Sequence, residues 1–153
     1  MSAAVKSTII GLGEFKAQLA RIGKAARGEM LAKAGEAGLQ LVVNAAIPKA
    51  PKRTGTLRRS IHTEVLEKRD DYAEVAVGTD VVYAAIQEFG GVIVPKKAKM
   101  LHWVGEGGID IFAHSVTIKP HPYLRPAWDE NESKMIQEVK NSLTQLIETA
   151  AAG

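Results

Sequence analysis

The sequence predicts an α+β fold, in which a small antiparallel β-sheet has a long N-terminal helix and a C-terminal helix packed on it. Three observations lead to this prediction. Apolar residues recur at spacings of three or four over residues 15–45 and again over residues 128–150, as in amphipathic helices. Residues 57–77 alternate between apolar and polar types around a charged turn. Two apolar segments within residues 100–118 flank a glycine-rich turn, which is typical of a second hairpin.

The first predicted helix spans residues 15–45, and Pro48 is expected to end it. Four glycines interrupt its apolar pattern, and each costs a helix roughly 1 kcal/mol relative to alanine. Two interpretations stay open: the segment breaks into two helices, or its small residues let another helix approach closely. The glycines are Gly23, Gly28, Gly35 and Gly38. Residues 47–55 contain two prolines and a glycine, so they are expected to form a loop.

The first hairpin follows this loop. In residues 57–65 mainly apolar positions alternate with polar ones, which predicts a strand with one buried face. A charged turn at residues 67–71 leads to a second strand at residues 72–77, and the two strands should pair antiparallel.

The centre of the chain contains a short helix and a second hairpin. Residues 81–91 are expected to form a helix ended by Gly90 and Gly91, with an extended apolar run as the alternative. Strand segments at residues 100–104 and 109–118 are expected to pair across the flexible tip Gly105–Gly108.

The segment 121–127 connects the last strand to the C-terminal helix. Proline loses no hydrogen bond in the first turn of a helix, so Pro126 is expected to start this one, with Arg125 at the cap position. Arginine is not a capping residue, so its guanidinium is expected to hold a carboxylate or carbonyl elsewhere. Glu88 lies in an apolar stretch and needs a partner if it is covered. We hypothesise that Glu88 and Arg125 pair within or between subunits; the alternative is that both are solvated.

Composition limits the class of protein. The 153 residues favour one domain, 1–153, with flexible ends at residues 1–10 and 150–153. The chain is 46% hydrophobic but 5% aromatic, so its core must be built mainly from Ala, Val, Ile and Leu and should gain from partner contacts. No cysteine is present, which excludes disulfides and thiolate chemistry. No apolar segment approaches the roughly 20 residues that span a bilayer, so we expect a soluble, unexported protein with no membrane contact.

The residues that carry common chemistries do not form a recognisable site. Histidines at 62, 102, 114 and 121 lack the short spacing of a preorganised metal site. Ser60 and Ser115 lack a nucleophile-elbow pattern, and Gly11–Gly13 is too short for a phosphate loop. We therefore expect no catalytic, cofactor-binding or metal-binding residue, and no cofactor.

Two basic clusters are candidates for contact with phosphates or with acidic partner surfaces, although loop lysines are usually just solvated. The net charge of +3 is too balanced for a dedicated nucleic-acid binder. The first cluster is Lys49, Lys52, Arg53, Arg58 and Arg59, and the second is Lys96, Lys97 and Lys99. The candidate contact residues among them are Lys49, Lys52, Arg53, Lys96 and Lys97.

Three patches, Ala50–Ile61, Tyr83–Gly90 and Pro122–Ala127, together resemble the small neck proteins of long-tailed bacteriophages, called head-tail joining, tail-completion or minor tail proteins. The resemblance covers roughly residues 10–150 and implies a long N-terminal helix, an antiparallel sheet, a C-terminal helix and assembly into a ring, commonly of six subunits. Residues 92–118 are mapped least securely, and their role is open. The candidate assembly residues are Thr54, Gly55, Leu57, Tyr83, Glu88, Gly90, Tyr123, Leu124, Arg125 and Pro126.

The resemblance implies a non-enzymatic virion protein that is assembled in the host cytoplasm and forms a ring in the neck of a tailed phage or prophage. Its expected partners are further copies of itself, a head-completion or connector protein, and a tail terminator or tail tube protein, with non-specific DNA contact in the lumen. The alternative is a virion-morphogenesis or tail-terminator-like assembly protein. A nucleic-acid-binding protein or enzyme is the remote alternative.

Overall fold

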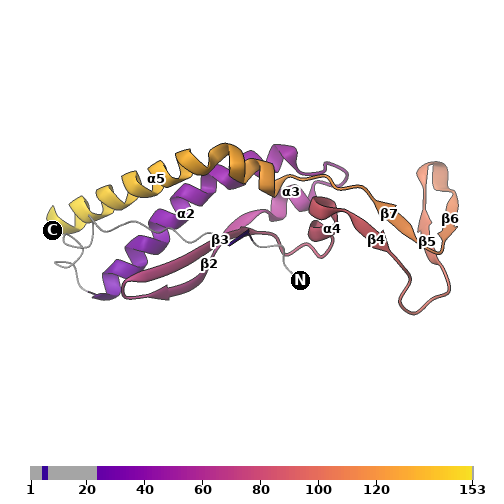
Figure 1. The fold of residues 1–153 in the computed structure, drawn as a ribbon, viewed down its shortest axis with the longest axis horizontal. Coiled ribbons are helices and arrows are strands. Elements are labelled where there is room, and N and C mark those ends of the chain that lie inside the picture. The colour runs from indigo at the N-terminus through magenta and orange to yellow at the C-terminus, as the bar shows by residue number, and fades with distance from the viewer. Residues whose placement is uncertain (1–4, 7–23, 153) are drawn as a thin grey trace.

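The computed structural model describes residues 5–6 and 24–152 and confirms the α+β fold class (Figure 1). Two long helices and three small antiparallel sheets make up these residues, joined by two short helices and a 3₁₀ turn at Glu106–Gly108. In chain order the elements are β1 (Val5–Lys6), α2 (Lys24–Lys49), α3 (Thr56–Ser60), β2 (His62–Arg69), β3 (Tyr72–Gly78), α4 (Ala84–Phe89), β4 (Gly91–Ile93), β5 (Leu101–Val104), β6 (Asp110–Ala113), β7 (Val116–Ile118) and α5 (Leu124–Ala152).

Helix α2 is continuous across Gly28, Gly35 and Gly38, so the two-helix interpretation is wrong for this part; residues 15–23 of the predicted helix lie outside the described residues. The close-approach interpretation is confirmed at Gly38. A Cβ atom at this position would overlap the Val139 side chain of α5 and lie 2.8 Å from the carbonyl oxygen of Met135. The helix also runs one residue past Pro48, because a proline in the last turn removes a single hydrogen bond.

The three-stranded sheet lies on α2. Its strand order is β1-β3-β2, and neighbouring strands are antiparallel. The predicted hairpin is confirmed as β2 and β3, with Arg69 opposite Tyr72, so the charged turn is shorter than expected. Gly35 lets β3 approach α2, because a Cβ atom there would lie 2.9 Å from Cγ2 of Val75. Helix α2 therefore packs against both α5 and the hairpin (Figure 1).

The strand predicted at residues 57–60 is wrong, because Thr56–Ser60 forms the short helix α3. Gly55 adopts φ 72°, a conformation that glycine reaches without strain, and the Arg59 N–H donates to the Gly55 carbonyl oxygen at 3.1 Å. The turn places Leu57 in the core, so its apolar character reflects burial from a helix rather than from a strand.

The most extended part of the molecule is an arm, defined as Gly91–Ile118 (Figure 1). The ladder β4–β7 forms its root and the ladder β5–β6 its far end. The predicted pairing across the glycine tip is confirmed for β5 and β6. Residues 109–118 do not form one strand, however. The strand is interrupted at His114–Ser115, and β7 then pairs with β4.

Helix α5 begins at Leu124, two residues before the predicted start at Pro126, so Arg125 lies inside the helix rather than at its cap. Its buried face carries Met135, Val139, Leu143 and Ile147, as the apolar spacing predicted. Residues 150–152 belong to this helix, while residues 1–4, 7–10 and 153 lie outside the described residues, so the flexible ends stay a prediction. Within the described ranges, no helix is long and apolar enough to cross a membrane.

Candidate functional site

The three patches named above meet around α4. We call this region the junction and define it as residues 50–61, 83–90 and 122–127. One buried cluster contains a residue from every patch: Leu57, Ala84, Tyr123 and Leu124. The sequence places these segments far apart, and the fold makes them neighbours.

Glu88 connects the second and third patches by capping α5. Its carboxylate accepts hydrogen bonds from the backbone N–H groups of Tyr123 at 2.8 Å, Leu124 at 3.0 Å and Arg125 at 2.9 Å. These donors have no partner within the helix, and the helix dipole favours a negative charge at this end. The Glu88 side chain is only 4% exposed, so the three hydrogen bonds compensate for its burial.

Within one subunit, Glu88 does not pair with the Arg125 guanidinium, and pairing between subunits stays a prediction. The two residues meet, but Arg125 donates through its backbone N–H, and its side chain is exposed. No ion pair among the described residues joins them. A cap supplied from 35 residues upstream has no local sequence signal, which explains why the start of α5 was placed at Pro126.

Tyr123 lies beside this cap and is fully buried. Its hydroxyl group finds no hydrogen-bond partner in the described part of the chain. Burial, and secondly the negative charge of Glu88, raises the pKa of Tyr123 to about 12. Since it belongs to the buried cluster that also contains Ala84 of α4 and Ala127 of α5, Tyr123 contributes packing rather than titration at neutral pH.

The last turn of α4 holds both ends of the arm. The Gly90 N–H donates to the Ile86 carbonyl oxygen at 2.9 Å, and the His121 N–H donates to the Gln87 carbonyl oxygen at 2.7 Å. Gly90 has φ 69°, and a Cβ atom there would lie 2.8 Å from the Ile118 carbonyl oxygen and from the Pro120 ring. The junction therefore fixes the direction in which the arm leaves the body.

Two basic side chains in or next to the first patch, Arg58 and Lys49, form contacts within the subunit. Arg58 donates from Nε to the Ala50 carbonyl oxygen at 2.8 Å and from Nη2 to that of Pro48 at 2.9 Å. It thereby neutralises the C-terminal end of α2. Lys49, predicted to contact phosphates or acidic partners, pairs with Glu130 of α5 at 2.8 Å. Arg58 therefore has a structural role, which could not be recognised from the sequence because the residue lies in a basic cluster.

The other candidate cations, Lys52, Arg53, Lys96 and Lys97, are exposed. Lys52 and Arg53 lie in the loop before α3, and Lys96 and Lys97 lie in the arm between β4 and β5. The two pairs thus belong to different parts of the molecule, and the structure does not gather them into one patch at the junction.

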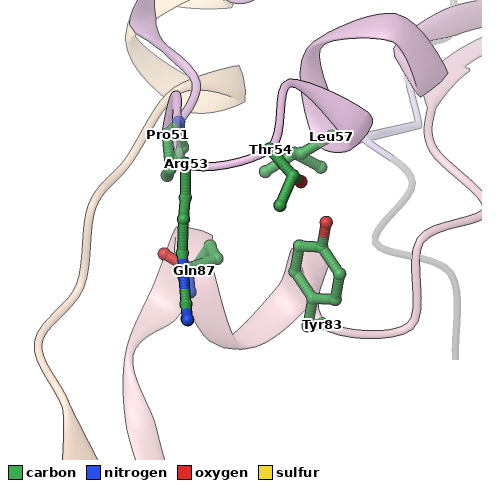
Figure 2. Close-up of a pocket in the computed structure, with 6 residues that line it drawn as sticks. All are labelled: Pro51, Arg53, Thr54, Leu57, Tyr83 and Gln87. Carbon is green, nitrogen blue, oxygen red and sulfur yellow. The ribbon is translucent and has the colours of Figure 1, made fainter. Parts of the chain in front are cut away.

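A pocket of about 310 Å³ opens between α4 and the segment 51–57, which contains the loop before α3 and the first residues of α3 (Figure 2). Figure 2 shows the Tyr83 hydroxyl pointing toward Thr54 and Leu57, and the Arg53 side chain extending from the loop toward Gln87. The volume is at the small end of ligand pockets, which span roughly 300–1,000 Å³. It suits one large side chain. Pro51, Arg53, Thr54, Leu57, Tyr83 and Gln87 line it.

Comparisons with known proteins add one finding. Residues 13–90 match the profile of a family described as "Bacteriophage HK97-gp10, putative tail-component". The matched segment includes α2, the β2–β3 hairpin and α4, and thus the first two patches of the junction. No curated protein and no solved structure gives a significant match to the chain.

Proposed function

The chain belongs to the HK97-gp10-like family of bacteriophage tail components, and from this premise we propose that it forms a ring in the head-tail connector of a tailed phage or prophage. The ring joins the capsid-side connector to the tail and lets DNA pass through its lumen. The family is one of structural components, so a role in the virion without catalysis agrees with membership.

The observation that carries the proposal is the arm held by the junction. Among the described residues, none between Gly91 and His121 is buried, yet both ends of this segment are fixed by α4. A projection of this kind adds no core to its own subunit. The arm therefore supports a function in which it contacts neighbouring subunits or other virion proteins.

A closed ring requires two different surfaces on each subunit, because the same contact must repeat around the axis. The arm and the body offer such a pair. The outer edge of β2 is a further candidate, since it carries the exposed side chains Val65 and Leu66 and its strand has a neighbour on one side in the sheet order.

The further partners in this proposal are a head-completion or connector protein on one side and a tail terminator or tail tube protein on the other. Lys52, Arg53, Lys96 and Lys97 are exposed and suit contacts with acidic partner surfaces or, without sequence preference, with the DNA backbone.

Particle joining tests the proposal. Capsids and tails from a phage that lacks this gene are mixed with the purified protein and counted as joined particles by electron microscopy. We expect the protein to restore joining and to lie at the neck. Normal joined particles without the protein, or its position at the distal end of the tail, would instead favour the virion-morphogenesis alternative.

A further inference from the structure

We propose that the tip of the arm, Val104–Phe112, docks head to tail into the junction pocket of a second copy of this chain. The inference deepens the proposed function, because it names the contact between neighbouring subunits.

The arm lacks the means to be stable by itself. It consists of two two-stranded ladders, and such ladders are marginal in water unless a further strand or helix covers them. Ten large apolar side chains from Phe89 to Phe112 are exposed. They present on the order of 800 Å² to solvent, which equals one side of a standard protein–protein interface. Four of these side chains, Val104, Ile109, Ile111 and Phe112, belong to the tip, so a partner that covers the tip accounts for the apolar character of this end.

The tip combines apolar anchors with acidic groups. Ile109 directly follows the 3₁₀ turn and is 66% exposed, and Phe112 lies in β6 opposite His102 and is 60% exposed. Phe112 stacks on His102 with ring centroids 4.7 Å apart, and Nε2 of His102 lies 2.7 Å from Oδ1 of Asp110. These contacts hold Phe112 in place. The segment from residue 103 to residue 113 contains Glu106 and Asp110 but no lysine or arginine.

The pocket has the complementary chemistry. Pro51, Leu57 and the Tyr83 ring give it an apolar lining, and Arg53 stands at its edge. Lys52, Arg53 and Arg59 are exposed basic side chains in this segment, while Arg58 is engaged by carbonyl groups at the end of α2. Residues 51–59 contain no acidic side chain. An apolar pocket with a basic rim fits an aromatic anchor with acidic neighbours, and such central anchors dominate interface energies. The acidic tip also disfavours DNA as its occupant.

The pocket that receives the tip must belong to another copy. Figure 1 places β5 and β6 at the far end of the arm, away from α3 and α4. The arm root is fixed by the Gly90 and His121 hydrogen bonds, so the tip does not fold back onto its own pocket. A tip that enters a different surface on the next copy makes a heterologous contact, which closes a ring or extends a filament.

Cysteine cross-linking tests the contact, because the chain has no native cysteine. Ile109→Cys labels the tip and keeps Phe112, while Gln87→Cys labels the pocket. The two variants are mixed and oxidised, both as purified proteins and on joined particles. We expect a cross-linked dimer that contains one of each variant, and little dimer from either alone. The control is Gln145→Cys, an exposed position on α5 outside the junction, mixed with the tip variant.

A charge swap tests the same contact without chemical capture. Glu106→Arg and Arg53→Glu should each weaken self-association by roughly tenfold, and the double variant should restore it. Circular dichroism of each variant checks that the fold is kept.

The outcomes separate this inference from the proposed function. If particles join but the mixed dimer and the charge rescue are absent in both settings, the docking contact is wrong and the connector function stands. Self-cross-linking of the tip variant would replace it with a symmetric arm–arm contact. A protein that stays monomeric and joins no particles overturns both.

Discussion

Replacing Glu88 by alanine should lower the free energy of unfolding by about 3–5 kcal/mol. The substitution leaves the N–H groups of Tyr123, Leu124 and Arg125 without their acceptor. The first two hydrogen bonds are buried, and an unpaired buried donor costs about 1–3 kcal/mol. The third is partly accessible, so water replaces it at a smaller cost. The loss of a negative charge at the start of α5 adds to the effect.

Arg125→Ala is the matched control, because it retains the backbone donor and removes an exposed side chain. It should change stability by less than about 0.5 kcal/mol. Glu88→Gln should lie between the two, since its amide keeps one acceptor oxygen but loses the charge. Urea denaturation followed by circular dichroism measures all three, with comparison of midpoints at constant slope. The assignment of the cap to Glu88 is refuted if Arg125→Ala destabilises as much as Glu88→Ala.

Two further substitutions test the packing. In thermal melts at pH 7, Tyr123→Phe should leave stability unchanged or raise it by about 1 kcal/mol, because the buried hydroxyl has no partner within the described residues. A large loss of stability would reveal a hydrogen-bond partner. In the wild type, the pKa of Tyr123 is raised to about 12 from 10.0, so the unfolded chain releases its proton first and stability should fall by about 2–3 kcal/mol between pH 10 and 12. The Phe variant should lack this component, and identical pH profiles would contradict the shift. Gly38→Ala should lower the free energy of unfolding, measured in urea, by about 2 kcal/mol or more, because its Cβ would meet Val139 and Met135 of α5. Alanine favours helices, so a stabilised variant would mean that α2 and α5 lie farther apart.

Local periodicity predicted the elements whose burial repeats regularly along the chain. The apolar spacing of Met135, Val139 and Leu143 identified α5, and the alternation around Val75 identified β3, because these patterns reflect one buried face. The glycines of α2 were ambiguous in the sequence. Only the partners placed opposite Gly35 and Gly38 show that they serve close packing.

The features that sequence reasoning missed depend on residues far apart in the chain. Leu57 was assigned to a strand, because its apolar neighbours alternate, whereas the turn at Gly55 makes it part of a helix. The cap of α5 comes from Glu88, and the C-terminal carbonyl groups of α2 bind Arg58. Strand β1 pairs with β3 through two residues, too short a segment to recognise. The sequence identified the three patches and suggested a contact between Glu88 and Arg125, but it did not indicate that the first patch packs with the other two.

The most direct test of the account is the mass and shape of the purified protein, measured by light scattering and electron microscopy, alone and after addition of tails or capsids. We expect closed rings of several subunits, in solution or on the particles, with the arm of each copy lying over the junction of the next. A strict monomer that binds neither tails nor capsids would contradict it.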